Sequence, residues 1–447
     1  MMKSNIIKFV KRSLLALPLV VAPAISSVVV QELGFDASFG VVAAGECKSR
    51  KLPGVSQSMA KQLTKVQEFI QPPEGSTAKP NLNAAIAELG KIGKKKDKFN
   101  QYELSQLYTF YAYAYYMQEN VPQALKNYKL VVAQSPMIPC GIEAQNLYTI
   151  AQLEFMQEDY KESIKYLQKW LKISTLVTAN NNAFFASVYY QSGDQNSALK
   201  YINKAVNDYE AKGKKPKEDW FAVQRALYYE KEDYSQVINI LEKLVVFYPK
   251  TTYYKQLSSM YAVTSRDREH LGMLDATYVL GALTKEKELL NLAYLYLDKD
   301  APYLSAKILT KGMKAKVIPE TMENLELLAN AWIMASEPKK AALALVKAAP
   351  KSNKGNLYAL LARTYVMTEE FSKAASAGNK AIKKGGIKRA DQLQITIGQA
   401  YMELNQYSKA SAAFKAAAKD KRSKKSAENW IRFSASQKRR WELYNKG

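Results

Sequence analysis

The sequence predicts an all-α fold, a superhelical solenoid of about ten antiparallel helix pairs. The first observation is the spacing within residues 108–136, where Ala112 and Ala124 stand on two successive helices and aromatic residues follow each of them. Small residues let two helix axes approach closely, and the rings fill the space beside them. The same spacing returns at residues 397–417. The composition agrees, because 19 Gly and 15 Pro among 447 residues fit a continuous helical stack better than sheets.

These positions match the tetratricopeptide repeat pattern, in which each unit is one helix–turn–helix. The small residues of the first helices fall at Ala112, Ala151, Ala186, Ser258, Ala293, Ala329, Ala362 and Gly398. Those of the second helices fall at Ala85, Ala124, Ser163, Ala198, Ala306, Ala341, Ala374 and Ala410. Two units match less well. Residues 220–249 place Arg225 and Val237 at the small positions, and the second helix of residues 254–280 shows no clear Ala.

The chain divides into four predicted segments: an export signal at 1–44, a mature N-terminal segment at 45–55, the tetratricopeptide solenoid at 56–420, and a basic capping helix with its tail at 421–447. The signal is indicated by basic residues within the first twelve positions, followed by an uncharged, mostly apolar run from Ser13 to Val30. Small residues favour cleavage before Gly45. The alternative is an uncleaved inner-membrane anchor. Either way, the body is expected outside the cytoplasm.

The C-terminal segment has a different composition, with many Lys and Arg after Lys419. Ser423 is expected to cap a helix on which Ala427, Trp430 and Ser434 share one face. A solenoid needs a last helix with a polar outer face, and this helix suits that role. The alternative is a docking patch for anionic lipid or for an acidic segment.

The net charge of +24 favours an acidic partner or an anionic surface. Residues 1–44 hold four Lys or Arg and two Asp or Glu, so the remainder carries +22. Because export is expected, nucleic acid is not an expected partner, whereas peripheral contact with the inner membrane is. The oligomeric state is not readable from the sequence.

Cys47 and Cys140 could form a disulfide in an oxidising compartment. Glu46 stands where a lipid-modified cysteine needs a small residue, so a lipoprotein is not expected. Neither cysteine belongs to a CxxC motif, which gives redox catalysis no support.

Catalytic motifs are missing from the sequence. His270, the one histidine, stands in a predicted polar turn and is interpreted as an ordinary surface residue. No nucleotide-binding, metal-binding or nucleophile motif occurs. We therefore expect a non-enzymatic protein without cofactor or metal. The alternative of a sugar-active enzyme would need a carboxylate pair in a cleft.

By resemblance to tetratricopeptide proteins, the first helix of each pair lines a concave surface. The residues predicted to face this groove are Tyr113, Tyr116, Tyr148, Gln152, Phe155, Tyr190, Tyr229, Tyr294, Asn330 and Arg363. Such a groove suits an extended or Pro-rich peptide lying on aromatic rings. The alternative is that these tyrosines pack between repeats.

The order of several segments resembles exported tetratricopeptide proteins associated with TonB energy-transduction systems of Gram-negative bacteria. The likeness rests on residues 30–35, 151–160, 225–234, 328–332, 383–386 and 418–422. It implies a periplasmic scaffold, accessory to a TonB–ExbB–ExbD complex that energises outer-membrane uptake of iron-siderophore or haem. It transfers no binding residue. The alternative is a cell-envelope or cell-wall scaffold that holds an enzyme or an anionic polymer.

Overall fold

The computed structural model describes residues 50–72, 78–174 and 176–444. Within these ranges the regular structure is entirely helical, from α2 to α22, with two short 3₁₀ turns and no strand. The chain forms two compact units that meet in sequence between Tyr248 and Pro249. The predicted signal at 1–44 lies outside the described residues.

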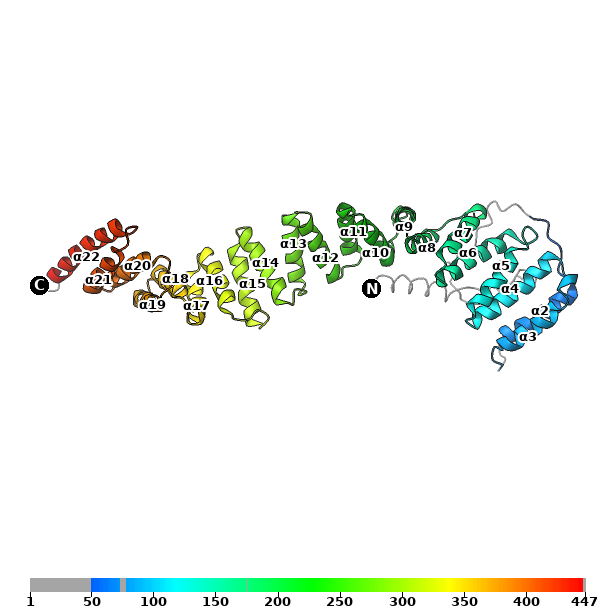
Figure 1. Cartoon of the computed structure of the whole chain (residues 1–447), viewed down its shortest axis with the longest axis horizontal. Coiled ribbons are helices and arrows are strands. Elements are labelled where there is room, and N and C mark those ends of the chain that lie inside the picture. The colour runs from blue at the N-terminus through cyan, green and yellow to red at the C-terminus, as the bar shows by residue number, and fades with distance from the viewer. Residues whose placement is uncertain (1–49, 73–77, 175, 445–447) are drawn as a thin grey trace. The chain divides into compact units, whose positions relative to one another are not determined.

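Each unit contains five antiparallel helix pairs, which Figure 1 shows in chain order. Unit 1 contains α2 (Gln57–Ile70), α3 (Leu82–Gly93), α4 (Gln101–Met117), α5 (Val121–Val132), α6 (Cys140–Met156), α7 (Tyr160–Ile173), α8 (Ala179–Gln191), α9 (Gln195–Glu210), α10 (Glu218–Glu230) and α11 (Tyr234–Phe247). Unit 2 contains α12 (Thr251–Val263), α13 (Asp267–Val279), α14 (Glu286–Asp298), α15 (Pro302–Lys314), α16 (Met322–Met334), α17 (Pro338–Ala348), α18 (Asn356–Met367), α19 (Phe371–Lys384), α20 (Ala390–Glu403), α21 (Tyr407–Ala417) and the final helix α22 (Lys424–Tyr444). The predicted all-α tetratricopeptide solenoid of ten helix pairs is confirmed.

The helices of a pair approach each other at small, fully buried residues. Ala112 and Ala124 are both inaccessible to solvent, as are Ala362 and Ala410. At two of these positions a serine hydroxyl contacts the partner helix, in Ser163 and in Ser258. Ser163 Oγ, for example, donates to the carbonyl oxygen of the residue twelve positions earlier, at 2.7 Å. Close approach at small side chains therefore sets the geometry of the pair.

The turn inside most pairs contains one residue with a positive φ angle. These residues are Glu119, Glu158, Gly193, Glu232, Ser265, Asp300, Ser336, Glu369 and Asn405. A residue in this left-handed conformation stops the first helix. In unit 1 the next residue then caps the second helix: Asp159, for example, accepts from the backbone N–H of Glu162. Only one of the nine is a glycine, so the sequence carried little signal for this turn.

The positions of these turns correct the predicted small residue of the second helix in two helix pairs. We call the small residue at which the two helices of a pair meet the crossing residue. In the second helix it lies five positions after the positive-φ residue, as with Glu119 and Ala124. Counting from Asp300 reaches Ser305 rather than the predicted Ala306, although both are buried. Counting from Ser265 reaches His270, which occupies the position where an Ala was sought.

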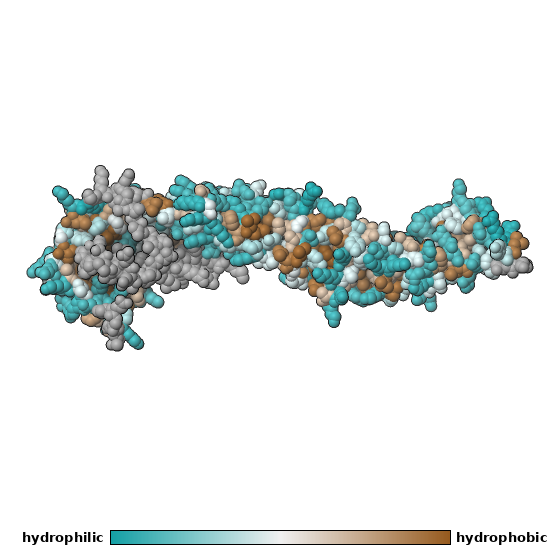
Figure 2. All heavy atoms as spheres, turned by 180° about the vertical axis from the view of Figure 1, so that it is seen from behind, coloured by the Kyte–Doolittle hydropathy of each residue, from teal (hydrophilic) through white to brown (hydrophobic). Residues whose placement is uncertain are grey.

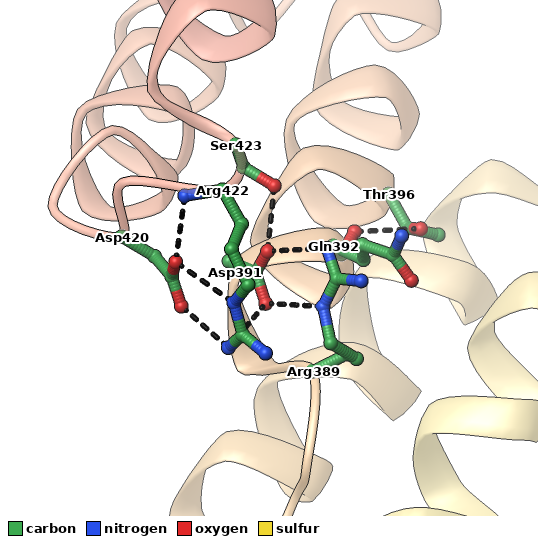
Figure 3. Close-up of polar contacts among 7 residues, drawn as sticks. All are labelled: Arg389, Asp391, Gln392, Thr396, Asp420, Arg422 and Ser423. Carbon is green, nitrogen blue, oxygen red and sulfur yellow. Dashed lines mark hydrogen bonds and ion pairs between the residues drawn. The ribbon is translucent and has the colours of Figure 1, made fainter.

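A polar cluster fastens the loop between α21 and α22 to the start of α20 (Figure 3). The buried carboxylate of Asp391 accepts from Arg389 Nη2 at 2.7 Å and from Ser423 Oγ at 2.6 Å. Arg422 lies 3.8 Å from the same carboxylate and pairs with Asp420 at 2.7 Å. The Ser423 hydroxyl, predicted to cap the last helix, therefore donates to Asp391. The Arg389 guanidinium in particular holds the pKa of Asp391 well below its usual range.

Enlarging the crossing residues should destabilise the protein. Ala124→Leu and Ala410→Leu should each cost about 1–3 kcal/mol, because added methylenes at a close crossing force strain. Ala211, the exposed C-cap of α9, is the matched control and should tolerate Leu. Urea unfolding followed by circular dichroism measures the difference. Equal midpoint shifts at all three sites would contradict the assigned register.

Two helical glycines should respond to alanine with opposite signs. A Cβ at Gly398 would lie 2.4 Å from the buried ring of Phe414, so Gly398→Ala should destabilise by about 1–3 kcal/mol. A Cβ at Gly272 would meet no atom within 4 Å, so Gly272→Ala should stabilise by about 0.5–1 kcal/mol through helix propensity. Thermal unfolding of the two variants tests this. Shifts of the same sign would show that close packing at Gly398 is not the constraint.

Replacing Asp391 should destabilise unit 2 in a pH-dependent way. The folded-state pKa lies below the ordinary value of 3.8, so the ionised carboxylate contributes stability above that pH and loses it as the pH falls. Asp391→Asn should cost about 1–3 kcal/mol near neutral pH, and the difference from the parent should shrink at acidic pH. Urea midpoints across the pH range measure it. Glu428→Gln, at an exposed site on α22, is the control and should cost little at any pH.

Candidate peptide-binding surface

In unit 2 a row of polar side chains lies at equivalent positions on successive first helices. Each follows the small crossing residue of its helix by one position: Ser259 on α12, Tyr294 on α14, Asn330 on α16, Arg363 on α18 and Gln399 on α20. Four of them are exposed and Gln399 is half-buried, with Tyr294 55% exposed. We call these five residues the central row. The structure thus brings together the predicted Tyr294, Asn330 and Arg363.

The central row has unused hydrogen-bonding capacity. Within the described residues, the side chains of Tyr294, Asn330, Arg363 and Gln399 take part in no hydrogen bond or ion pair. Ser259 differs, because its hydroxyl donates to the Lys255 carbonyl at 2.9 Å. The row can therefore offer amide, guanidinium and phenol groups to a ligand.

Exposed apolar side chains flank the central row, four positions further along three of its helices. Val263, Met334 and Met367 end α12, α16 and α18, and each is more than half exposed. They were not predicted to face the groove, although their constant offset from the crossing residue is visible in the sequence. The central row and these apolar helix ends together offer polar groups and flexible apolar contacts, a mixture suited to peptide ligands.

The predicted groove residues of α6 in unit 1 lie largely in the core. The Tyr148 ring packs 5.1 Å from Trp170 and 5.5 Å from Phe184, and burial raises the pKa of its hydroxyl. Phe155 is buried and packs against Phe184 at 5.7 Å. Gln152 is buried too. The assignment of Gln152 and Phe155 to a ligand-facing surface is therefore corrected, because their neighbours already cover them.

The other predicted tyrosines of unit 1 differ in exposure. Tyr113 and Tyr116 on α4 are half-buried against hydrophobic clusters. Tyr190 donates from its hydroxyl to Glu230 Oε1 at 2.9 Å, which joins two successive repeats. Tyr229 on α10 is 57% exposed. Packing between repeats therefore uses part of the predicted aromatic stripe.

The single histidine makes a contact between two helices that was not predicted. His270 lies in the first turn of α13 and is half-buried, not in a polar turn. Its Nδ1 lies 2.9 Å from both the hydroxyl and the carbonyl oxygen of Ser258 on α12. Ser258 is 2% exposed, so a substrate has no access to its hydroxyl. The pair links the two helices at their crossing.

Cys140 opens α6 and is disulfide-bonded. Cys47 lies outside the described residues, so the Cys47–Cys140 pair stays a prediction. Nearby contacts favour it: Arg50, three residues after Cys47, donates to the Ile138 carbonyl at 3.0 Å and to Glu143 at 2.6 Å. These acceptors stand on either side of Cys140 in the sequence.

Among the described residues, no group of three or more His, Cys, Asp or Glu side chains is arranged to hold a metal ion. No helix in the same ranges is both long and apolar enough to cross a membrane.

No protein-family model and no curated protein matches this sequence. Solved tetratricopeptide structures do align with it. The TPR2AB domain of yeast Sti1 in its pHSP90 complex is 16% identical over 57% of this chain and 98% of its own, with a TM-score of 0.27. YrrB, a TPR protein with an unusual peptide-binding site, is 15% identical over 42% of this chain and 90% of its own, at 0.32. A tetratricopeptide repeat protein from Parabacteroides merdae is 12% identical over 57% and 98%, at 0.26. Likenesses this distant assign no site or partner.

Proposed function

We propose that this chain is a non-enzymatic scaffold that holds an extended peptide segment of a partner protein along the central row of unit 2. The observation that carries the proposal is the alignment of Tyr294, Asn330, Arg363 and Gln399 on successive first helices, with side chains that have no hydrogen-bond partner in the described residues.

The chemistry of the row suits an extended backbone. The amides of Asn330 and Gln399 can each donate to and accept from a peptide group, and Arg363 can pair with a carboxylate. Met334 and Met367, at the helix ends, can hold apolar side chains of the same ligand.

A row of contacts on successive helices favours an extended ligand, and a Pro-rich segment in the polyproline II conformation is extended. Because the conformation is preformed in Pro-rich segments, binding them costs little ordering entropy.

We place this scaffold outside the cytoplasm as an accessory of a TonB–ExbB–ExbD complex in the periplasm. The apolar segment Ser13–Val30 supports export, and the order of segments that resembles TonB-associated tetratricopeptide proteins supports the partner. TonB-type proteins carry a Pro-rich periplasmic segment as a general family character, and a protein of net charge +24 favours its acidic part. The second candidate is a cell-wall scaffold, which the basic charge also favours.

Removing the central row should weaken peptide binding. The triple variant Tyr294→Ala, Asn330→Ala, Arg363→Ala should lose at least about tenfold in affinity for a synthetic Pro-rich peptide with alternating Glu and Lys, since few residues carry most of the binding free energy. Isothermal titration calorimetry measures it, and circular dichroism checks the fold.

The matched control removes exposed side chains from second helices of the same unit. Leu304→Ala, Leu343→Ala and Lys383→Ala lie on α15, α17 and α19 and also delete one charge. This variant should bind as the parent does. Equal binding by the central-row variant would refute the proposed site. Affinity purification from membranes tests the partner separately: co-purification of cell-wall enzymes without TonB, ExbB or ExbD would favour the second candidate.

A further inference from the structure

The final helix carries a surface that the packing of the repeats does not use. α22 has 21 residues, whereas its partner α21 has 11. Only Ala427 and Ser434 of α22 are buried. Trp441 packs 6.3 Å from Tyr407, the first residue of α21, so the residues after Trp441 extend past the partner helix.

The outward side of α22 is both basic and apolar. At helical spacing it presents two adjacent rows, all of whose members are exposed: Lys425, Arg432, Ser436, Arg439 and Leu443 in one, and Asn429, Phe433, Arg440 and Tyr444 in the other. We call these nine residues the outer face of α22. The face contains no carboxylate. Its large side chains are far from covered, with Phe433 48%, Leu443 75% and Tyr444 92% exposed.

The nearby acidic groups do not neutralise this face. Glu428 borders the face, one turn from Lys425 and from Arg432, and makes no ion pair within the described residues. Glu442 lies to one side and faces Lys438 at 3.7 Å. Asp420, before the helix, pairs with Arg422 at 2.7 Å. Lys425, Arg439 and Arg440 make no ion pair in the described part of the chain. Four cations beside the one bordering carboxylate of Glu428 leave the face net positive and available to an anionic partner.

We infer that the outer face of α22 docks on an anionic phospholipid surface. Basic side chains attract acidic headgroups, while Phe, Leu and Tyr side chains among them enter the headgroup boundary, as in helices that lie flat on a membrane. Figure 2 shows hydrophobic residues among hydrophilic ones at the C-terminal end of the chain. An acidic peptide fits less well, because one convex helix offers no groove and an acidic peptide makes no use of the exposed apolar side chains.

The polar cluster around Asp391 fixes the position of α22 on the repeats. It ties the residues just before α22 to α20, and Trp430 of α22 stacks on Phe414 of α21 at 5.5 Å. The inward side of α22 thus packs on unit 2, and the outer face points away from it. The inference is independent of peptide binding at the central row.

Vesicle co-sedimentation of the full chain tests the inference. Binding is measured to phosphatidylcholine vesicles and to vesicles that also contain phosphatidylglycerol, and the difference between the two is compared among variants. Any binding through the apolar leader is the same in every variant, because none of them changes it. Arg432→Gln, Arg439→Gln and Arg440→Gln together should reduce binding to the anionic vesicles about a hundredfold. Raising salt from about 0.1 M to about 1 M should also weaken parent binding, because the Debye length falls from about 10 Å to about 3 Å.

A charge-matched control separates this face from general basicity. Lys94→Gln, Lys95→Gln and Lys96→Gln remove the same charge from an exposed run in unit 1 and should leave binding unchanged. Phe433→Ala with Leu443→Ala should weaken binding at both salt concentrations. Hydrogen exchange should show protection of residues 436–444 when anionic vesicles are added.

Three outcomes would overturn the inference. The first is equal losses in the arginine variant and the lysine control. The second is no loss in the arginine variant. The third is protection of α22 by polyglutamate but not by anionic vesicles, which would assign the face to an acidic protein instead.

Discussion

Close contact between the two helices of each pair is the constraint on which the rest of this structure depends. Residues such as Ala112 and Ala124, or Ala362 and Ala374, are fully or almost fully buried because the helix axes meet there. Larger side chains also occupy this position, as with the buried Val237 and with His270, whose ring contacts Ser258. Gly398 shows the limit, since the ring of Phe414 occupies the space of a Cβ.

Because each first helix packs on its partner and on neighbouring repeats, only one stripe of it remains for other contacts. In unit 2 this stripe holds the central row and the apolar helix ends, which are open to solvent. In unit 1 the equivalent positions, one after the crossing residue, are more covered: Gln152 and Ser187 are buried and Tyr113 is half-buried. The same repeat geometry therefore produces a packed surface in one unit and an accessible one in the other.

The last helix covers the final helix pair, whose apolar surface would otherwise be exposed, as at the end of any stack of repeats. Small buried residues such as Ala427 and Ser434 lie against α21, and the loop before α22 is held by the buried Asp391 carboxylate. The charges on the opposite side are not needed for that cover. Together with the exposed Phe433, Leu443 and Tyr444 they form the outer face, for which we infer an anionic lipid surface as the partner.

The sequence by itself determined the fold class and the number of helix pairs, because small residues at a constant spacing repeat along the chain and close packing demands them. It also placed Tyr294, Asn330 and Arg363 on one stripe, since their offset from Ala293, Ala329 and Ala362 is constant. Local spacing could not decide which stripe residues stay exposed, because burial depends on neighbouring repeats: Phe155 is covered by Phe184 of the next helix pair. Nor could it reveal the positive-φ turns at residues such as Glu119, or the bond from Ser423 to Asp391. Those features depend on backbone geometry and on contacts between residues distant in sequence, which only the tertiary structure decided.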